Sequence, residues 1–572
     1  MNTKDEPETV DVVICGCGPT GALLAAYLGK LSIPHIVLDK EKEITTDPRG
    51  IALDEDGIRL LQGMDSFKFI GGTETCLGQA PFLTLDYSTT EGGTGHVGFI
   101  CHNQPRLEKH LREAMTSSPF CNLRAQSAVT NIWEEDDWSY CVYNDSEGVD
   151  HVIRSKYFVG ADGKTGYTRK NYLEPKGIVM ERSTETLYDE TWVALNWHIT
   201  LPTPITHPDF PLWTLGYSPE EVYDLFFPRG QSFLCNPQRP AVCGRFGLPS
   251  DRLWRFEFVV RKEEDGDLMA TNEMVERVVS PYFTHKGDRY SLNEDVKFPS
   301  DCIKILRSRP YMFSARCCNS WALDRVILCG DAAHVFPPYG GQGIASGFRD
   351  AASLAWRLAL LCRDRPSKQP RHKEVLSGWF LERRRREGMV HYEHLPGLPF
   401  LPDMLGGMCV PQVYCKRLEG NKDEVLFTDD VILRPEEGGL FRIFGYLKDY
   451  QGLQSAKAML QNIEKVSGGE FCACDVPFII ESGPGSSYDA CQQDAKGLKG
   501  LYQIATGEDF AKSPLCRRRP EPRNFDPYYL GKKIQLKRFV VLRPDRFIFA
   551  ACDTQEELER AITSAVDYLK GK

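Results

Sequence analysis

The first segment whose residues could do chemistry is a glycine-rich stretch, residues 16–21 (GCGPTG), which has the pattern GxGxxG. It follows an apolar, β-branched run at residues 10–15 and opens a stretch with apolar residues at helical spacing, residues 19–31. In such a pattern the first glycine allows a tight turn, the second lets the backbone approach a diphosphate, and the third lets the helix pack closely. The positive end of the helix stabilises phosphate charge. The segment therefore predicts a site for a dinucleotide.

A carboxylate follows the next strand-like run. Residues 35–38 (HIVL) are interpreted as a second strand, which is followed by Asp39, so that strand, helix and strand form a βαβ unit. A carboxylate at this point accepts hydrogen bonds from ribose hydroxyls and repels a 2′-phosphate, which favours FAD or NAD over NADP. These residues alone do not separate FAD from NAD.

Two further segments favour FAD. Residues 157–163 (YFVGADG) run from a strand into an Asp-Gly turn, and residues 325–334 (RVILCGDAAH) run from a strand into a Gly-Asp turn. A carboxylate at a strand end, here Asp331, can bind a ribityl hydroxyl. The next segment, residues 337–343 (PPYGGQG), opens a helix whose free N–H groups would stabilise negative charge on a reduced flavin ring. The chain has no second GxGxxG after a strand and no CxxC pair, which disfavours disulfide reductases and enzymes with two dinucleotide folds.

The order of these motifs resembles the single-component FAD-dependent aromatic hydroxylases, and within them the phenol, resorcinol and 3-(3-hydroxyphenyl)propionate hydroxylase branch. Residues 330–360 carry the strongest resemblance, supported by residues 48–50 (PRG), 102–108 (HNQPRLE) and 188–192 (YDETW). This chain departs from the family pattern at two places. Ala345 stands where many members have Asn, and Gly166 stands where many have a small hydroxyl residue.

The resemblance implies roles for particular residues. Asp331, Gln104 and Arg49 would contact the flavin cofactor, and the Asp162-Gly163 turn would serve both FAD and NAD(P)H. Together with the motif residues, the expected cofactor-binding set is Gly16, Gly18, Pro19, Thr20, Gly21, Asp39, Lys40, Arg49, Gln104, Asp162, Gly163, Gly330, Asp331, Pro338, Gly341, Gln342, Gly343 and Ile344. His334 is interpreted as a residue that shapes the flavin loop, by which we mean the segment from Gly330 to Gly343.

The implied reaction is the hydroxylation of a phenolic or related small aromatic substrate by NAD(P)H and O2 through a flavin C4a-hydroperoxide. NAD(P)H would dock transiently, reduce FAD and leave. The same fold also performs epoxidation and Baeyer–Villiger oxidation of polycyclic substrates, and this alternative stays open. A nicotinamide dehydrogenase or a non-catalytic flavin-fold protein is disfavoured by the intact flavin motifs.

Three residues are candidates for catalysis: Asp54, Tyr217 and Tyr223. Asp54 could act as a base near the flavin, or it could cap a helix that contains Ile58. The two tyrosines fall in the middle region, where substrate is expected, but tyrosines in such sequences more often pack in a core.

The elements that must position these residues suggest several domains, because 572 residues exceed the ~250–300 of a single core. The expected fold is α/β: a Rossmann-like FAD-binding domain (residues 1–180 and 301–395) interrupted by an antiparallel-sheet substrate domain (181–300). No helix clearly separates the segments between residues 192 and 260. Residues 410–572 resemble a thioredoxin-like domain that lacks CxxC, with strands before and after residues 543–545 and a final helix that begins at Thr554.

Composition excludes some partners. The net charge of −10 argues against nucleic-acid binding, no apolar run approaches the ~18 residues of a membrane helix, and no signal peptide is evident. The 20 cysteines show no zinc-ligand spacing, so no metal site is expected and free thiols in a reducing, cytoplasmic location are favoured. A homodimer is what the resemblance implies.

Overall fold

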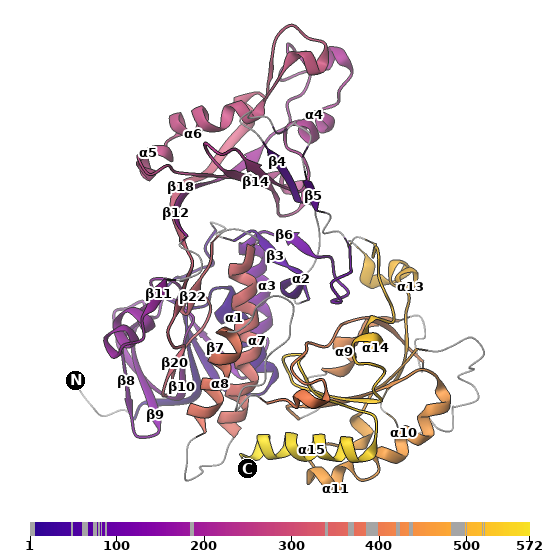
Figure 1. Ribbon diagram of the computed structural model, residues 1–572. Helices are drawn as coiled ribbons and strands as arrows, with labels where there is room; N and C mark the ends of the chain where they lie inside the picture. The colour runs from indigo at the N-terminus through magenta and orange to yellow at the C-terminus, as the bar shows by residue number, and fades with distance from the viewer. Residues whose placement is uncertain are drawn as a thin grey trace.

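The computed structural model describes residues 6–46, 50–59, 67–71, 77, 81, 83–85, 89–182, 188–337, 341–363, 371–384, 399–418, 424–433, 439–481, 498, 500–517, 519 and 521–571. Three large sheets organise these residues (Figure 1). No helix among them is long and apolar enough to span a bilayer.

The first sheet carries the glycine-rich motif. Its order is β20-β21-β10-β1-β2-β7, and the pairs β21/β10, β10/β1, β1/β2 and β2/β7 are parallel. The strand bounds are β1 Glu8–Cys15, β2 His35–Leu38, β7 Cys121–Arg124, β10 Asp150–Gly160, β20 Ala322–Leu323 and β21 Val326–Leu328. The antiparallel strands β8 (Ala128–Glu135) and β9 (Trp138–Asn144) extend it beside β10. Strands from before and after the second sheet therefore meet in one sheet.

Helices pack against this sheet. The helix α1 (Pro19–Lys30) packs against α3 (Gln104–Thr116) and the long α7 (Gln342–Arg363). Val13, Ile14, Leu24 and Leu28 are fully buried between sheet and helices, which explains why both runs are so apolar. The short ribbon of β3 (Ala52–Asp54) and β6 (Phe99–Cys101), with α2 (Glu55–Ile58), lies between this layer and the second sheet (Figure 1).

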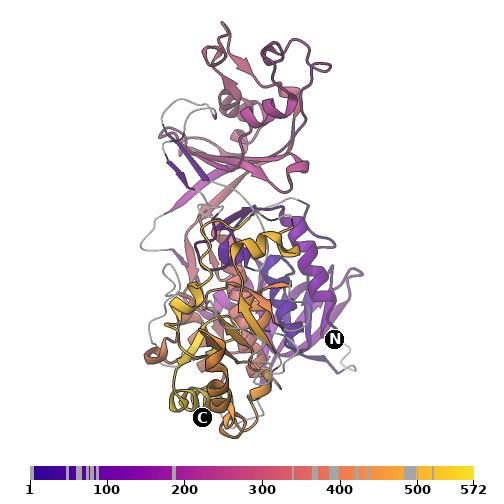
Figure 2. The same cartoon turned by 90° about the vertical axis from the view of Figure 1, so that its right-hand side faces the viewer.

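The second sheet stands at one end of the molecule (Figure 2). Its order is β18-β12-β15-β14-β13-β4-β5, and every pair is antiparallel except β13/β4. The bounds are β4 Phe67–Gly71, β5 Leu83–Leu85, β12 Asp189–Ile199, β13 Gln231–Cys235, β14 Ala241–Phe246, β15 Leu253–Val259 and β18 Ile303–Ser314. The sheet thus extends beyond the expected range 181–300 at both ends.

A helix does occur between residues 192 and 260, contrary to the sequence reading. The helix α4 (Pro219–Phe226) begins with a capping box in which Ser218 and Glu221 bond each other's backbone. Val222, Tyr223 and Phe226 are its buried face, and they pack with Val193, Leu195, Trp197 and Trp254 on one face of the sheet. The helix has only eight residues, too few for its period to stand out in the sequence.

The third sheet contains the C-terminal residues, in the order β24-β23-β27-β26-β25-β28-β29. The bounds are β23 Tyr414–Arg417, β24 Val425–Phe427, β25 Arg442–Leu447, β26 Phe478–Ile480, β27 Leu501–Ile504, β28 Phe539–Leu542 and β29 Ile548–Cys552. The expected hairpin around residues 543–545 is present, since β28 and β29 pair antiparallel. The final helix α15 (Gln555–Lys570) begins at Thr554 with the expected capping box to Glu557.

Candidate flavin and substrate site

The glycine-rich loop has the shape that diphosphate binding requires. Gly16 has φ of +102°, and a side chain there would collide with the backbone of Ala161 at the end of β10. A side chain at Gly21 would strike the carbonyl oxygen of Gly16. By contrast, a Cβ built on Gly18 meets no atom within 4 Å. Gly18 is the N-cap residue of α1, and as a glycine it places no side chain over the start of the helix. The helix N-terminus therefore opens onto free space at Gly18, with Pro19 at its first position.

Thr20 joins this loop to the third motif. A Cβ on Gly330 would lie 2.8 Å from the Thr20 hydroxyl, and a Cβ on Gly347 in α7 would collide with the same oxygen. The two glycines thus let α1, α7 and the Gly-Asp turn pack around one small side chain. This contact brings motifs more than 300 residues apart to a single point.

Asp39 lies at the end of β2 and is buried. Its carboxylate accepts a hydrogen bond from Arg112 at 2.8 Å, and the same guanidinium donates to the carbonyl of Cys17 at 3.1 Å. Arg112 therefore ties the acidic residue to the glycine loop, and its Nε atom is buried with no hydrogen-bond partner among the described residues. Sequence reasoning missed Arg112, although Gln104, Glu108 and Arg112 recur every fourth residue along one face of α3. Lys40 follows Asp39 and is exposed.

The Asp-Gly turn is organised by Asp162. One of its carboxylate oxygens accepts from the backbone and the hydroxyl of Thr168, at 2.8 and 2.9 Å. Burial raises the pKa of this carboxyl. A side chain at position 166 would collide with the carboxylate, which explains the glycine there, and Thr168 supplies the hydroxyl instead. Gly163 has φ of +81° and open space beside it.

The Gly-Asp turn is held by a residue of α7. Gly330 and Asp331 form the short helix η8 (Gly330–Ala332) after β21. The carboxylate of Asp350, which is fully buried, accepts from the backbone of Gly330 at 3.0 Å and lies 2.6 Å from Nε2 of His334. The contact with Asp350 therefore fixes the ring of His334 in the loop, which is compatible with its interpretation as a loop-shaping residue. The carboxylate of Asp331 is exposed beyond the strand end.

The flavin loop meets β3 and α3. Gln104 accepts a hydrogen bond from Gly50 at 2.7 Å and donates to Glu108 at 2.6 Å, while a side chain on Gly50 would press against Ile344. Gly341 has φ of +61° beside Ala52, and Gly343 has nothing within 4 Å of a built Cβ. Arg49 and Pro338 lie outside the described residues.

Asp54 is bound on both sides. One carboxylate oxygen caps α2 by accepting from Gly57 at 3.0 Å. The other accepts from Gln342 at 3.0 Å and pairs with Arg349 of α7, whose guanidinium also donates to Gln342 and Asp56. Asp54 thus has the contacts of a helix cap and of an anchor for Gln342.

The two tyrosines lie elsewhere. Tyr223 of α4 is buried in the aromatic core of the second sheet, with the guanidinium of Arg245 4.1 Å from its ring centre, and burial raises its pKa. Tyr217 packs against the same core and meets Tyr290 edge-on. Both tyrosines pack in the core that includes Phe226 of α4, and α4 lies on the side of the sheet away from β3 and β6 (Figure 1), so the structure does not bring either tyrosine to the flavin motifs.

The opposite face of the second sheet carries a row of polar residues. Strand register places Asn196 between Arg255 and Arg307, with Gly244 beyond Arg255 and Gln231 beyond Gly244. We call this set the polar row. Asn196, Arg255 and Gln231 are buried, and Arg255 donates to Asn196 at 2.9 Å. Gln231 lies 3.1 Å from the sulfur of Cys101 in β6, so the row faces the β3–β6 ribbon.

His102 follows β6 and lies next to the polar row. Neither ring nitrogen has a hydrogen-bond partner among the described residues, although both are buried. Burial lowers the pKa of His102 to about 4; the adjacent backbone of Asn103 opposes this shift and the charge of Arg255 reinforces it. The ring is therefore neutral at physiological pH. Glu257, two positions along β15 from Arg255, is also buried, and burial raises the pKa of its carboxyl.

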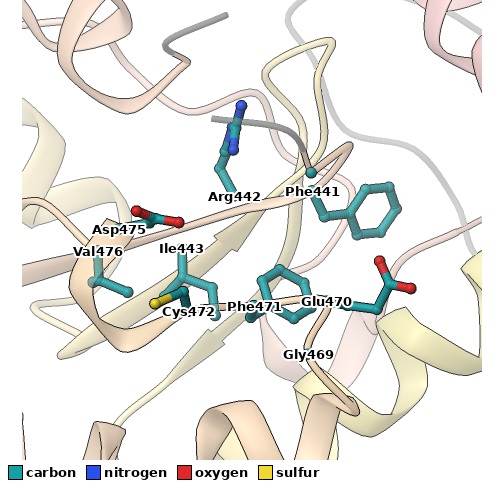
Figure 3. A pocket seen from close by; sticks show the side chains of 10 residues that line it. Phe441, Arg442, Ile443, Gly469, Glu470, Phe471, Cys472, Asp475 and Val476 are labelled. Atoms are coloured by element: carbon teal, nitrogen blue, oxygen red, sulfur yellow. The ribbon is translucent and has the colours of Figure 1, made fainter. Parts of the chain in front are cut away.

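A pocket in the third sheet is separate from these motifs. Figure 3 shows its lining, which comes from β25 and the segment that precedes β26 and includes Phe441, Arg442, Glu470, Cys472 and Asp475. No residue of the flavin motifs lines it.

The described cradle fits a flavin dinucleotide. Open space adjoins Gly18, Gly163 and Gly343, a helix N-terminus faces the first of these, and Arg112 and Asp39 flank the loop. The donors and the one carboxylate at the end of β2 suit a diphosphate and a ribose.

Comparison with known proteins agrees with this geometry. Curated relatives include the 3-(3-hydroxy-phenyl)propionate/3-hydroxycinnamic acid hydroxylases of Paraburkholderia xenovorans (strain LB400), 27% identical over 69% of this chain and 56% of the relative, and of Burkholderia cenocepacia (strain HI2424), 28% identical over 77% and 68%. The chain thus spans little more than half the length of the first of these.

Solved structures share the fold along the whole chain. Aklavinone-11 hydroxylase in complex with FAD and aklavinone, and the flavin-dependent monooxygenase PieE in complex with FAD and substrate, each align with 99% of this chain and 100% of their own, with TM-scores of 0.62 and 15% identity. A family model described as "FAD binding domain" matches residues 9–370. Since that match covers more than half of the 572 residues and all three motifs, this chain belongs to the FAD binding domain family.

Proposed function

We propose that this chain is an FAD-dependent monooxygenase that uses NAD(P)H and O2 to hydroxylate a phenolic or related aromatic substrate. The observation that carries the proposal is the meeting of the glycine loop, the Gly-Asp turn and α7 around Thr20. The buried polar row of the second sheet would be the surface that receives the substrate. FAD, when bound, supplies the redox chemistry by accepting a hydride and passing one atom of O2 to the substrate. The chain's own residues must hold the cofactor and the substrate and keep water out.

The cofactor would be held from both ends. Gly18 and the N-terminus of α1 would receive the diphosphate, and Asp39, fixed by Arg112, the adenosine ribose. Asp331 would take the ribityl hydroxyls, while Gly341, Gly343 and Ile344 would face the ring. In this proposal Asp54 acts as a positioning residue, because its contacts to Gln342 and Arg349 fix the start of α7.

The polar row is the proposed substrate surface. It faces the ribbon that includes Asp54 and the segment leading to Gln104, so a ring bound against it would lie beside the flavin loop. Gly244 makes room for the amide of Gln231, which a side chain at position 244 would strike. Arg255 would stabilise an anionic oxygen on the substrate, and a phenolate is more reactive toward an electrophilic oxygen than a phenol. His102 would accept a hydrogen bond from a hydroxyl.

Two further parts of the proposal concern the rest of the chain. The third sheet would be a thioredoxin-like unit without CxxC, with a role in packing and not in catalysis. Tyr217 and Tyr223 would support the second sheet through their aromatic contacts rather than act on the substrate.

The test begins with the absorption spectrum of the purified protein and NAD(P)H oxidation in the presence of phenols with and without a carboxylate. A flavin spectrum, phenol-stimulated oxidation and a product heavier by one oxygen would support the proposal. A flavin spectrum without response to any phenol would favour the alternative, epoxidation or Baeyer–Villiger oxidation of a polycyclic substrate. No flavin after addition of FAD would contradict both.

Replacement of Arg255 sharpens this test. Arg255→Met should raise the KM for an anionic phenol about 10- to 100-fold, the value of one charged hydrogen bond, and leave the flavin spectrum unchanged. Arg261→Met, an exposed arginine just beyond the same strand, is the matched control and should leave KM unchanged. Equal KM values for the two variants would remove Arg255 from the proposal.

A further inference from the structure

Three side chains of metal-ligating type meet at the edge of the second sheet, outside the flavin motifs. His207 lies in the loop after β12, and Asp301 and Cys302 belong to η7 (Ser300–Cys302), just before β18. Backbone hydrogen bonds hold both segments: Thr200 donates to the carbonyl of Cys302 at 2.8 Å, and His207 donates to that of Thr203 at 2.8 Å. The three ligand atoms lie within 4.8 Å of one another.

Their separations fit a shared cation. Nε2 of His207 is 3.1 Å from both carboxylate oxygens of Asp301 and 3.8 Å from the sulfur of Cys302. For zinc bonds of standard length at tetrahedral angles, the nitrogen would lie about 3.4 Å from the oxygen and about 3.6 Å from the sulfur. A cation could therefore enter with shifts of only a few tenths of an ångström.

The alternative of a nucleophilic cysteine does not fit. In a Cys–His–Asp relay the carboxylate and the thiol must bond different ring nitrogens, so that one nitrogen donates to the carboxylate while the other takes the thiol proton. Here the carboxylate and the thiol approach the same nitrogen, Nε2. Burial, with the charge of Asp301, raises the pKa of the Cys302 thiol to about 11, so it is not a thiolate on its own at neutral pH.

The imidazole is oriented for coordination. Nδ1 of His207 lies 2.9 Å from the hydroxyl of Thr206. When Nδ1 donates its proton to that hydroxyl, Nε2 carries none and can act as a ligand, the arrangement that is usual for metal-bound histidines. The side chain of His207 is 19% exposed and Cys302 is buried, while Asp301 faces solvent and leaves a path of entry.

We propose that His207, Asp301 and Cys302 bind a divalent transition-metal cation of the zinc class, with one coordination position left to water. On binding, the Cys302 thiol loses its proton to solvent, and the cation is held by a thiolate, a neutral imidazole and a carboxylate. The ligands are 94 and 95 residues apart in sequence, which is why no motif spacing revealed them.

The chain contains a built-in comparison. Cys472, Cys474 and Asp475 also cluster, next to the pocket of Figure 3, but the two sulfurs are 2.7 Å apart. Two thiolates on one tetrahedral zinc would be about 3.8 Å apart, so this second cluster does not fit the cation.

The test uses the full chain after treatment with a chelator and dialysis against zinc chloride. Zinc bound to the wild type should show one sulfur neighbour at about 2.3 Å by X-ray absorption. Cys302→Ser should abolish that signal, and Cys302→Ser, His207→Gln and Asp301→Asn should each weaken zinc uptake at least about 10-fold. Zinc should raise the melting temperature of the wild type and not of these variants, which also checks that they fold.

The double variant Cys472→Ser/Cys474→Ser is the matched control and should bind zinc as the wild type does. The proposal is overturned if the wild type takes up no zinc, if the bound zinc has no sulfur neighbour, or if Cys302→Ser and the exposed change Asp301→Asn leave uptake unaltered. Transfer of the zinc signal to the control cluster would overturn it equally.

Discussion

The second and third sheets contact the flavin-motif region in different ways. The third sheet is held by buried charges: Asp429 accepts from Arg59 of the α2 segment at 2.8 and 2.5 Å and from Arg546 at 2.6 Å. The second sheet contacts the start of α3 through Arg106 and Asp251, at 2.7 and 3.0 Å, and the arginine is half exposed. Breaking the contact of Asp429 would leave buried charges without a partner, which is costly. Breaking the exposed pair of Arg106 and Asp251 costs little, because water can solvate both groups.

A further buried cluster strengthens the contact of the third sheet. Asp545, in the turn between β28 and β29, accepts from Trp356 of α7 at 3.1 Å and from Arg543 at 2.9 and 2.6 Å. Since α7 begins at the flavin loop, the third sheet supports the helix that positions Gln342. The difference teaches that buried charges fix the third sheet to the region of the flavin motifs, while the charged contact of the second sheet with that region is open to solvent.

Removal of the Asp429 carboxylate should have the largest effect. Asp429→Ala leaves Arg59 and Arg546 buried without their counter-charge, and we expect a loss of about 3–5 kcal/mol in the free energy of unfolding. The midpoint of urea unfolding measures it. Asp403→Ala, which breaks the exposed pair with Arg560, is the control and should cost less than about 1 kcal/mol. Similar losses for the two variants would contradict the comparison.

Acid should weaken the same contact. Burial alone would raise the pKa of Asp429, but the charges and hydrogen bonds of Arg59 and Arg546 lower it to about 2. Because the folded-state pKa lies below the unfolded value, this stabilisation is present above pH 4 and is lost as pH falls from about 4 to 2. Its size is about 2 kcal/mol for the difference between the two pKa values. Between about pH 4 and pH 2 the melting temperature of the wild type should fall more steeply than that of Asp429→Asn. Parallel curves for the two proteins would show that Asp429 is not the group that titrates.

Removal of the exposed contact should have the smallest effect. Arg106→Ala should change the free energy of unfolding by no more than about 1 kcal/mol, because solvent screens the pair with Asp251. Added salt should weaken this ion pair in the wild type, so that its free energy of unfolding approaches that of the variant. A loss as large as that of Asp429→Ala would show that the two contacts do not differ in kind.

The elements that were predictable depend on local signals. The strand–loop–helix of the glycine motif, the hairpin around residues 543–545 and the helix from Thr554 follow from patterns within about 20 residues. Helix α4 was missed because it is short. Strand β4 was missed because it pairs with β13, far along the chain, and β5 because it pairs with β4. Pairing of this kind is decided by tertiary packing, which no local pattern encodes.

The residues of the site likewise fall into those that a local pattern predicts and those that it does not. The spacing of Gly16, Gly18, Gly21 and Asp39 could be recognised because all four belong to one βαβ unit. Arg112 was within reach of a helical-face argument from Gln104 and Glu108. Arg255 and Asn196 were not, because they meet only through the register of β12 with β15. His102 was noted only as part of a motif, and the structure adds that both of its ring nitrogens are buried without a hydrogen-bond partner among the described residues.

The position of β4 has a consequence for engineering. Residues 67–71 run parallel to β13 and cover one side of it, yet they precede every strand of the sheet other than β5 by more than 100 residues. Grafting residues 189–314 into another scaffold would leave the backbone groups of β13 unpaired on that side, an open edge that recruits other chains. A chimera that exchanges the second sheet must therefore carry both segments, and a cut that separates them should yield aggregates.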